Sequence, residues 1–245
     1  MDAELAMNTL RNWIDESENI VFFGGAGVST ESGIPDFRGT GGLYNQQYKY
    51  PPETIVSRKF YVNNLDEFYD FYRNKMLFLS AKPNSAHIEL ARLEKIGKLK
   101  AVITQNIDGL HYEAGSKNVL EIHGSIHRNY CLRCHKCFDA SYIMSFDGPP
   151  CCDECGGLVK PDVVLYGESL DQNVIDASID AIEACDLLIV GGTSLTVYPA
   201  NGFINYYKGN KLVLINKTPT DFDNKADLLI HDSIGKALTY KSDPM

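Results

Sequence analysis

Six of the seven cysteines lie between Cys131 and Cys155. Cys131 and Cys134 form one CxxC pair, and Cys152 and Cys155 form a second. The 17 residues from 135 to 151 separate the pairs, within the roughly 15–20 residues of a four-cysteine zinc site. Each pair can occupy two corners of a tetrahedron around one ion. Four protein ligands leave no open coordination position, so the expected zinc is structural.

Other side chains near the two pairs leave this ligand set open. Those that could also bind zinc are Cys137, which forms another CxxC pair with Cys134, then Cys151, His127 and His135. The start of the chain, Met1–Glu4, shows no signal-peptide pattern. Seven cysteines in a cytosolic chain favour a metal over disulfides. Cys185 stands apart beside an apolar run, and we expect it in the core.

A zinc ribbon that binds nucleic acid is the alternative interpretation of the cysteine segment. Its only strong cations before Asp139 are Arg128, Arg133 and Lys136, which are too sparse for a track of phosphates. The formal net charge of -9 also argues against a general binder of nucleic acid or anionic membranes. It suits a cationic partner, such as a Lys-rich protein segment.

A second candidate site follows the apolar run Ile20–Phe23, which breaks at Gly24-Gly25-Ala26-Gly27. A strand followed by a glycine turn can present N–H groups to a pyrophosphate. Thr30 stands where a dehydrogenase fingerprint has its third glycine, and residues 45–47 offer no acid for a ribose. An NAD-dependent dehydrogenase is therefore disfavoured. Residues 36–38 add an acid, an aromatic ring and a guanidinium that could lie over a bound cofactor.

Short apolar runs alternate with helical patterns along the chain. Strands are expected at 20–23, 101–103, 119–122, 163–166, 187–190, 212–215 and 228–230. Helices are expected at 3–16, 65–79, 83–93 and 171–184, and a loop at 39–52. The alternation predicts an α/β fold with a doubly wound, mostly parallel Rossmann-like sheet. Motifs that follow its strands should converge on one crevice at their carboxyl ends.

Composition indicates a soluble globular protein, 44% hydrophobic and 22% charged. No apolar run approaches the roughly 20 residues that span a bilayer, so a cytoplasmic protein is expected. The aromatic residues within 65–79 follow a helical spacing that is more typical of core packing than of a cofactor site. We therefore expect a small helical insertion there. His87 is expected to be structural.

The run Ile20–Gly39 (IVFFGGAGVSTESGIPDFRG) resembles the signature of the sirtuins, the NAD-dependent protein lysine deacylases. Three further blocks match that family in order: Thr104–His111 (TQNIDGLH), His123-Gly124 and Gly192–Leu195 (GTSL). Gly156-Gly157 completes a CxxCGG pattern that is similar to the family's, which favours the outer cysteine pairs as the zinc ligands. The resemblance covers nearly the whole chain.

The resemblance implies a single, compact, bacterial-type sirtuin catalytic domain over residues 1–245. Its large Rossmann-like part would comprise about 1–38, 82–123 and 160–245. Its smaller part would combine a helical insertion, 39–81, with a zinc module, 124–159. The protein is expected to be a monomer.

The activity that the resemblance implies is removal of acetyl, or other uncharged acyl, groups from protein lysines. NAD would be consumed as a co-substrate, giving deacylated lysine, nicotinamide and 2′-O-acyl-ADP-ribose. His123 matches the family's general base, and an imidazole has an ordinary pKa near working pH. Asn106 matches a second catalytic residue. The implied NAD contacts are Ala26, Thr30, Phe37, Arg38, Gln105, Ile107, Asp108, Thr193, Ser194, Asn216 and Ile234.

The same resemblance implies that an acetyl-lysine peptide binds as an added strand between residues 161–168 and 192–199. Val164 and Tyr166 would line the acyl tunnel, where the family more often has Phe at the second position. Sirtuins that remove succinyl or malonyl groups share a Tyr-x-x-Arg pair. Here Tyr72 takes the arginine's place and Arg73 follows about 100° further round the helix. Uncharged acyl groups are therefore expected, with ADP-ribosyl transfer as a lesser activity.

Overall fold

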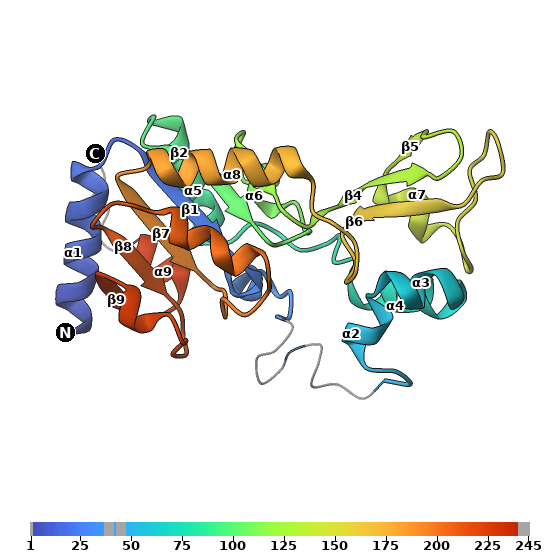
Figure 1. Cartoon of the computed structure of the whole chain (residues 1–245), viewed down its shortest axis with the longest axis horizontal. Coiled ribbons are helices and arrows are strands. Elements are labelled where there is room, and N and C mark those ends of the chain that lie inside the picture. Colours follow the sequence, from blue (N-terminus) through green and yellow to red (C-terminus); the bar gives the residue numbers. More distant parts are fainter. Residues whose placement is uncertain (1, 37–41, 43–47, 240–245) are drawn as a thin grey trace.

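The computed structural model describes residues 2–36, 42 and 48–239 of the chain (Figure 1). The expectations for Phe37 and Arg38, and for most of the loop at 39–52, lie outside these described residues. The described chain forms two sheets that lie in two parts of the molecule, a larger part and a smaller part.

The larger part holds a six-stranded parallel sheet in the order β3–β2–β1–β7–β8–β9. Its strands are β1 (Ile20–Gly24), β2 (Leu99–Thr104), β3 (Val119–Glu121), β7 (Leu187–Gly191), β8 (Leu212–Ile215) and β9 (Leu228–Ile230). The strand order reverses between β1 and β7, which leaves a crevice beyond their carboxyl ends. The predicted Rossmann-like sheet is confirmed.

Helices cover both faces of this sheet (Figure 1). The helices of the described chain are α1 (Ala3–Glu16), α2 (Pro52–Ile55), α3 (Arg58–Asn63), α4 (Leu65–Lys75), α5 (Ser85–Lys95), α6 (Leu110–Glu113), α7 (Ala140–Met144), α8 (Gln172–Ala184) and α9 (Ile234–Leu238). Short 3-10 helices are η1 (Ala26–Val28), η2 (Thr30–Ser32), η4 (Ala200–Tyr206) and η5 (Asp223–Lys225). The helix expected at 65–79 is shorter than predicted and ends at Lys75.

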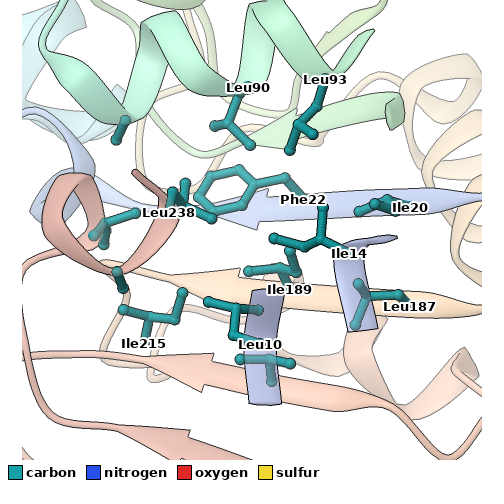
Figure 2. Packing of buried hydrophobic residues seen from close by; sticks show 14 of the residues in the cluster. Leu10, Ile14, Ile20, Phe22, Leu90, Leu93, Leu187, Ile189, Ile215 and Leu238 are labelled. Atoms are coloured by element: carbon teal, nitrogen blue, oxygen red, sulfur yellow. The ribbon is translucent and has the colours of Figure 1, made fainter. Parts of the chain in front are cut away.

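Alternating side chains of β1 give the sheet two apolar faces, because successive residues of a strand point to opposite sides. Ile20 and Phe22 lie in a core with α1, α5 and α9 (Figure 2). Val21 and Phe23 lie in a second core with α8 and η4. The buried Cys185 belongs to this second core, as predicted.

The smaller part contains a three-stranded antiparallel sheet, which lies at the far end of the molecule from α1 (Figure 1). Its strands are β4 (Gly124–Cys131), β5 (Cys137–Phe138) and β6 (Val159–Val163). The aromatic residues of α4 pack with this sheet in one core, and the Tyr69 hydroxyl donates to the carbonyl of Val159 at 2.5 Å. The helical insertion and the zinc module therefore pack together as one part.

The strand predicted at 163–166 is wrong in its extent and its sheet. Here β6 ends at Val163 and pairs antiparallel with β4 of the smaller part. Its apolar residues are consistent with burial in either sheet, and the choice depends on the partner strand, which lies far away in sequence.

His87 is a buried structural residue, as predicted. Its Nδ1 accepts the N–H of Asn84 at 3.3 Å and closes a capping box at the start of α5. Its ring lies 4.7 Å from the ring of His111 on α6. None of the described helices is long and apolar enough to cross a membrane.

Candidate active site and metal site

A cavity of about 1090 Å³ opens between the two parts, beyond the carboxyl ends of the parallel strands. It is lined by all predicted catalytic, cofactor and substrate residues that the structure describes. These are Ala26, Thr30, Gln105, Asn106, Ile107, Asp108, His123, Val164, Tyr166, Thr193, Ser194, Asn216 and Ile234. The expected convergence of the motifs on one crevice is confirmed.

Glycines allow the loops after β1 and β7 to meet without side chains between them. The Gly27 N–H donates to the carbonyl of Gly192 at 2.8 Å. A Cβ on Gly27 would lie 2.7 Å from the Gly192 Cα, and a Cβ on Gly192 would lie 2.4 Å from the Val28 nitrogen. Backbone therefore packs on backbone at the switch point, and the two loops together line the cavity.

Ser29 connects Asn106 and Asp108, two polar residues of the loop that follows β2. Its hydroxyl donates to Asp108 Oδ2 at 2.6 Å and accepts from Asn106 Nδ2 at 3.0 Å. Asp108 Oδ1 accepts the N–H of Leu110 at 2.9 Å. The sequence analysis did not single out Ser29, although it belongs to the glycine-rich run and is buried. A hydroxyl both donates and accepts, so it can hold an amide and a carboxylate together.

A second chain of hydrogen bonds joins three strand ends across the cavity. Gln105 Nε2 donates to Thr193 Oγ1 at 3.0 Å, and the Thr193 N–H donates to Asn216 Oδ1 at 3.1 Å. The buried Asn216 Nδ2 has no hydrogen-bond partner among the described residues. Because Asn216 lines the cavity, an acceptor on a ligand, such as a ribose oxygen, would satisfy this donor. NAD fits this end of the cavity.

His123 follows β3 and lines the cavity. Its Nδ1 lies 3.0 Å from the carbonyl oxygen of Gln105. A carbonyl only accepts, so Nδ1 carries the proton and Nε2 of the neutral ring is left as an acceptor. Burial lowers the pKa of His123, and the bond to Gln105 opposes this shift. The ring is therefore neutral near pH 7, with a basic nitrogen available.

The predicted acyl-tunnel residues lie on the segment that leaves β6. The Val164 N–H donates to the His123 carbonyl at 3.0 Å, which ties this segment to the candidate base. The Tyr166 N–H donates to Val56, and its carbonyl accepts from the N–H of Arg58 at 2.9 Å. The segment is thereby attached along one edge to the helical insertion.

Neither residue at the altered Tyr-x-x-Arg position is part of the cavity lining among the described residues. Tyr72 is fully buried in the core of the smaller part. Arg73 donates from Nη1 to the carbonyl of Gly148 at 2.9 Å and from Nη2 to that of Asp147 at 2.5 Å. The guanidinium of Arg73 is thus engaged by the loop after α7, consistent with the predicted turn of the helix.

The four predicted zinc ligands form one cluster. The Sγ atoms of Cys131, Cys134, Cys152 and Cys155 all lie within 4.8 Å of one another. Cys131 and Cys155 are 3.4 Å apart at Sγ, and Cys134 and Cys152 are 3.6 Å apart. A tetrahedron with Zn–S bonds of about 2.3 Å requires about 3.8 Å between sulfurs. A zinc ion fits this donor set.

The alternative ligands Cys137, Cys151, His127 and His135 lie outside this cluster, the one group of metal-binding type found in the described residues. Gly157 packs against the cluster, since a Cβ there would lie 2.9 Å from Cys131 Sγ. The backbone N–H of Arg133 points at the same sulfur at 3.3 Å. Such N–H contacts favour a thiolate over a thiol.

A parallel α/β fold with this crevice and a four-cysteine module defines an NAD-binding protein with a structural metal site. The sequence model of the Sir2 family matches residues 25–199 of the chain. An NAD-dependent protein deacetylase of Clostridium acetobutylicum is 60% identical over 95% of this chain and 96% of its own length. The chain belongs to the Sir2 family.

Two solved structures of Sir2 proteins show the same fold. One, with a deacetylated p53 peptide and 3′-O-acetyl-ADP-ribose, has a TM-score of 0.86 and 39% identity. Another, with a p53 peptide and NAD⁺, has a TM-score of 0.83 and 40% identity. Each match covers 95% of this chain and 95% of the other. The sirtuin resemblance inferred from the motifs is confirmed.

Proposed function

We propose that this protein is an NAD-dependent deacetylase that acts on acetylated lysines of proteins. The relatives that it matches are named NAD-dependent protein deacetylases. The observation that carries the proposal is the single cavity, which brings together His123, the Asn106–Asp108 loop and the ends of β7 and β8. The products would be unmodified lysine, nicotinamide and 2′-O-acetyl-ADP-ribose.

NAD would be held at both ends of the cavity. Asn106 and Asp108, joined through Ser29, would face the nicotinamide ribose and carboxamide, because an amide and a carboxylate satisfy their donors and acceptors. Thr193 and Asn216 would hold the phosphate and adenine-ribose end. The remaining contacts of the proposal are Ala26, Thr30, Phe37, Arg38, Gln105, Ile107, Ser194 and Ile234. When bound, NAD supplies an electrophilic ribose carbon that the acyl oxygen of the modified lysine attacks.

His123 would act as the general base on the ribose hydroxyls. The bond from Nδ1 to Gln105 leaves Nε2 ready to accept a proton, and the lowered pKa keeps this nitrogen free near pH 7. Asn106 would orient the reacting groups beside it. The cavity walls would limit the access of water to the reaction centre.

The zinc would be held by Cys131, Cys134, Cys152 and Cys155 and would serve structure alone, because the four thiolates complete its coordination. It would link the loop after β4 to the strand β6 that leads to the substrate segment. We infer that the smaller part comprises α2 to α4, α7 and β4 to β6. Strand β6 is thereby assigned to the smaller part, whereas the division expected from the sequence placed residues 160–245 in the larger part.

The substrate peptide would add as a strand between residues 161–168 and residues 192–199. Tyr166 already uses its backbone groups on one edge, toward Val56 and Arg58. In the described residues, the Gly167 N–H and the Val164 carbonyl make no backbone hydrogen bond. These groups could pair with a peptide, whose acyl-lysine would pass Val164 and Tyr166.

We further infer a preference for uncharged acyl groups, since Arg73 is held by the carbonyls of Asp147 and Gly148. We also propose that the protein is a monomer and acts in the cytoplasm. Its net charge of -9 supports the further proposal that it does not bind nucleic acid or anionic membranes.

The test is mass spectrometry of matched acetyl-lysine and succinyl-lysine peptides, incubated with the protein with and without NAD. We expect the acetyl group to be lost only with NAD, together with release of nicotinamide and acetyl-ADP-ribose, and the succinyl peptide to react far more slowly. An intact acetyl peptide, in a sample that contains zinc and binds NAD, would refute the deacetylase assignment.

A further inference from the structure

We propose that His127 is a positioning residue that holds the nicotinamide-binding loop in place from the smaller part of the molecule. The proposal rests on the deacetylase function above. His127 lies on β4, the strand that runs into the first zinc ligand, Cys131. Its Nε2 lies 2.9 Å from the carbonyl oxygen of Asp108, which belongs to the loop after β2. Because the carbonyl only accepts, Nε2–H is the donor.

An irregularity in β4 makes this contact possible. Residues 124 and 125 pair with β6, and the pairing resumes at Asn129, so residues 126–128 are released from β6. The Ile126 N–H then donates to the carbonyl of Ile107 at 2.9 Å. Bulges of this kind redirect a side chain toward a site. Two consecutive carbonyls of the loop, at Ile107 and Asp108, are thus bound by two consecutive residues of β4.

The imidazole of His127 also packs directly on the turn at Gly109. Gly109 has a φ of +75° and a Cβ there would lie 2.6 Å from His127 Cδ2. Glycine is therefore required twice, for the left-handed backbone and for the close approach of the ring. The exposed His127 ring therefore contacts the turn both through its hydrogen bond to Asp108 and through its packing on Gly109.

The orientation of this peptide unit matters for the Asp108 carboxylate. Its Oδ1 accepts the N–H of Leu110, one residue beyond the turn, and its Oδ2 accepts the Ser29 hydroxyl. If the Asp108 carbonyl exchanged His127 for water, the turn could rotate and the carboxylate with it. Among the described residues, Ile107 and Asp108 line the cavity and His127 does not. His127 therefore acts through the loop and not on the ligand.

The test compares His127→Leu, which removes the donor, with His127→Gln, whose amide N–H can still donate. We expect His127→Leu to weaken NAD binding measured by calorimetry, and to raise the inhibition constant of nicotinamide, each by about fivefold, the usual net value of one hydrogen bond. The KM of the acetyl peptide and the zinc content should not change. His127→Gln should recover most of the NAD affinity.

Affinity of His127→Leu within twofold of wild type would overturn the proposal, and so would equal losses in the Leu and Gln variants. If His127→Leu loses zinc or unfolds, the isosteric pair His127→Gln and His127→Glu decides, because the carboxylate cannot donate to the Asp108 carbonyl. Equal NAD affinity in that pair would refute the role. Calorimetry needs no turnover, so a wild-type protein that binds NAD without deacetylating peptides would refute the proposed function alone.

Discussion

At the scale of single residues, the site depends on polar groups whose partners determine their chemistry. The Nδ1 of the His123 ring is bound to the Gln105 carbonyl, so Nε2 is the nitrogen left to serve as the proposed base. The Ser29 hydroxyl both donates and accepts, so the Asn106 amide and the Asp108 carboxylate are held in one arrangement. Gln105, Asn106 and Asp108 follow β2, whereas Ser29 follows β1 and His123 follows β3. Each contact therefore joins the ends of two different strands and is a property of the fold.

His123→Ala should lower kcat for deacetylation by about 10²–10⁴, the usual contribution of a general base. NAD binding by calorimetry and the thermal unfolding midpoint should stay near the wild-type values, since the ring lies at the cavity surface. A variant that keeps more than half of the wild-type kcat would exclude His123 as the base.

Ser29→Ala should leave Asn106 Nδ2 and Asp108 Oδ2 without their shared partner in a buried site. The cost of such unpaired groups is about 1–3 kcal/mol, which we expect as a roughly tenfold rise in the Kd for NAD. Ser29→Cys keeps the volume but bonds weakly. It should therefore behave like Ser29→Ala, whereas a wild-type affinity in Ser29→Cys would show that volume matters and the hydroxyl does not.

At the scale of elements, β4 and β6 connect the metal cluster to the active site. β4 begins at Gly124, next to His123, and ends at Cys131 of the four-cysteine cluster. A Cβ on Gly124 would clash with the carbonyl oxygen of Asp162 on β6. Only glycine therefore allows the two antiparallel strands to pair this closely there. Disorder in the metal cluster can therefore be transmitted along β4 to the candidate base.

Cys131→Ser should abolish zinc binding and destabilise the smaller part, because the remaining thiolates cannot complete a tetrahedron. Zinc measured by atomic absorption and limited proteolysis of residues 124–163 give the two readouts. Cys137→Ser is the matched control, as this exposed cysteine lies outside the cluster. Retained zinc in Cys131→Ser, or lost zinc in Cys137→Ser, would contradict the ligand assignment.

At the scale of the whole molecule, a pair of buried histidines makes global stability depend on pH. His87 on α5 and His111 on α6 lie with their rings 4.7 Å apart. Burial lowers the pKa of His87 to about 4, opposed by the charge of Asp108. Burial, aided by His87, lowers the pKa of His111 to about 3. The folded protein therefore keeps both rings neutral at pH values where the unfolded chain binds protons.

The free energy of unfolding should be independent of this pair above pH 6.5, the ordinary pKa of a histidine side chain. It should fall as the pH drops from about 6.5 toward about 4, by about 1.4 kcal/mol per pH unit for each histidine. Urea unfolding at pH 7, 6 and 5 measures this slope. In His111→Phe the free energy of unfolding should change less steeply with pH, by about 1.4 kcal/mol per pH unit, because one titrating histidine is removed. An unchanged slope would show that His111 does not titrate on unfolding.

The parallel sheet and the zinc ligands could be predicted because their signals are local. Apolar runs such as Ile20–Phe23 mark buried strands wherever they occur, and a CxxC pair has its spacing in the sequence itself. The sequence could not predict which sheet residues 163–166 belong to. The run is apolar, which suits either sheet, and its pairing with β4 depends on the packing of the whole smaller part. The end of α4 at Lys75 depends in the same way on surrounding tertiary contacts.

The sequence alone predicts the family, the α/β fold class, the four-cysteine cluster and the site residues that line the cavity. These follow from residue types at characteristic spacings, which folding does not alter. Three contacts become visible only in the folded molecule: the bond of His123 to the Gln105 carbonyl, the bridge at Ser29 and the contact of His127 with the Asp108 carbonyl. Each of these is a hydrogen bond between groups that are distant in sequence, and such a bond exists only once packing has brought its donor and acceptor within about 3 Å.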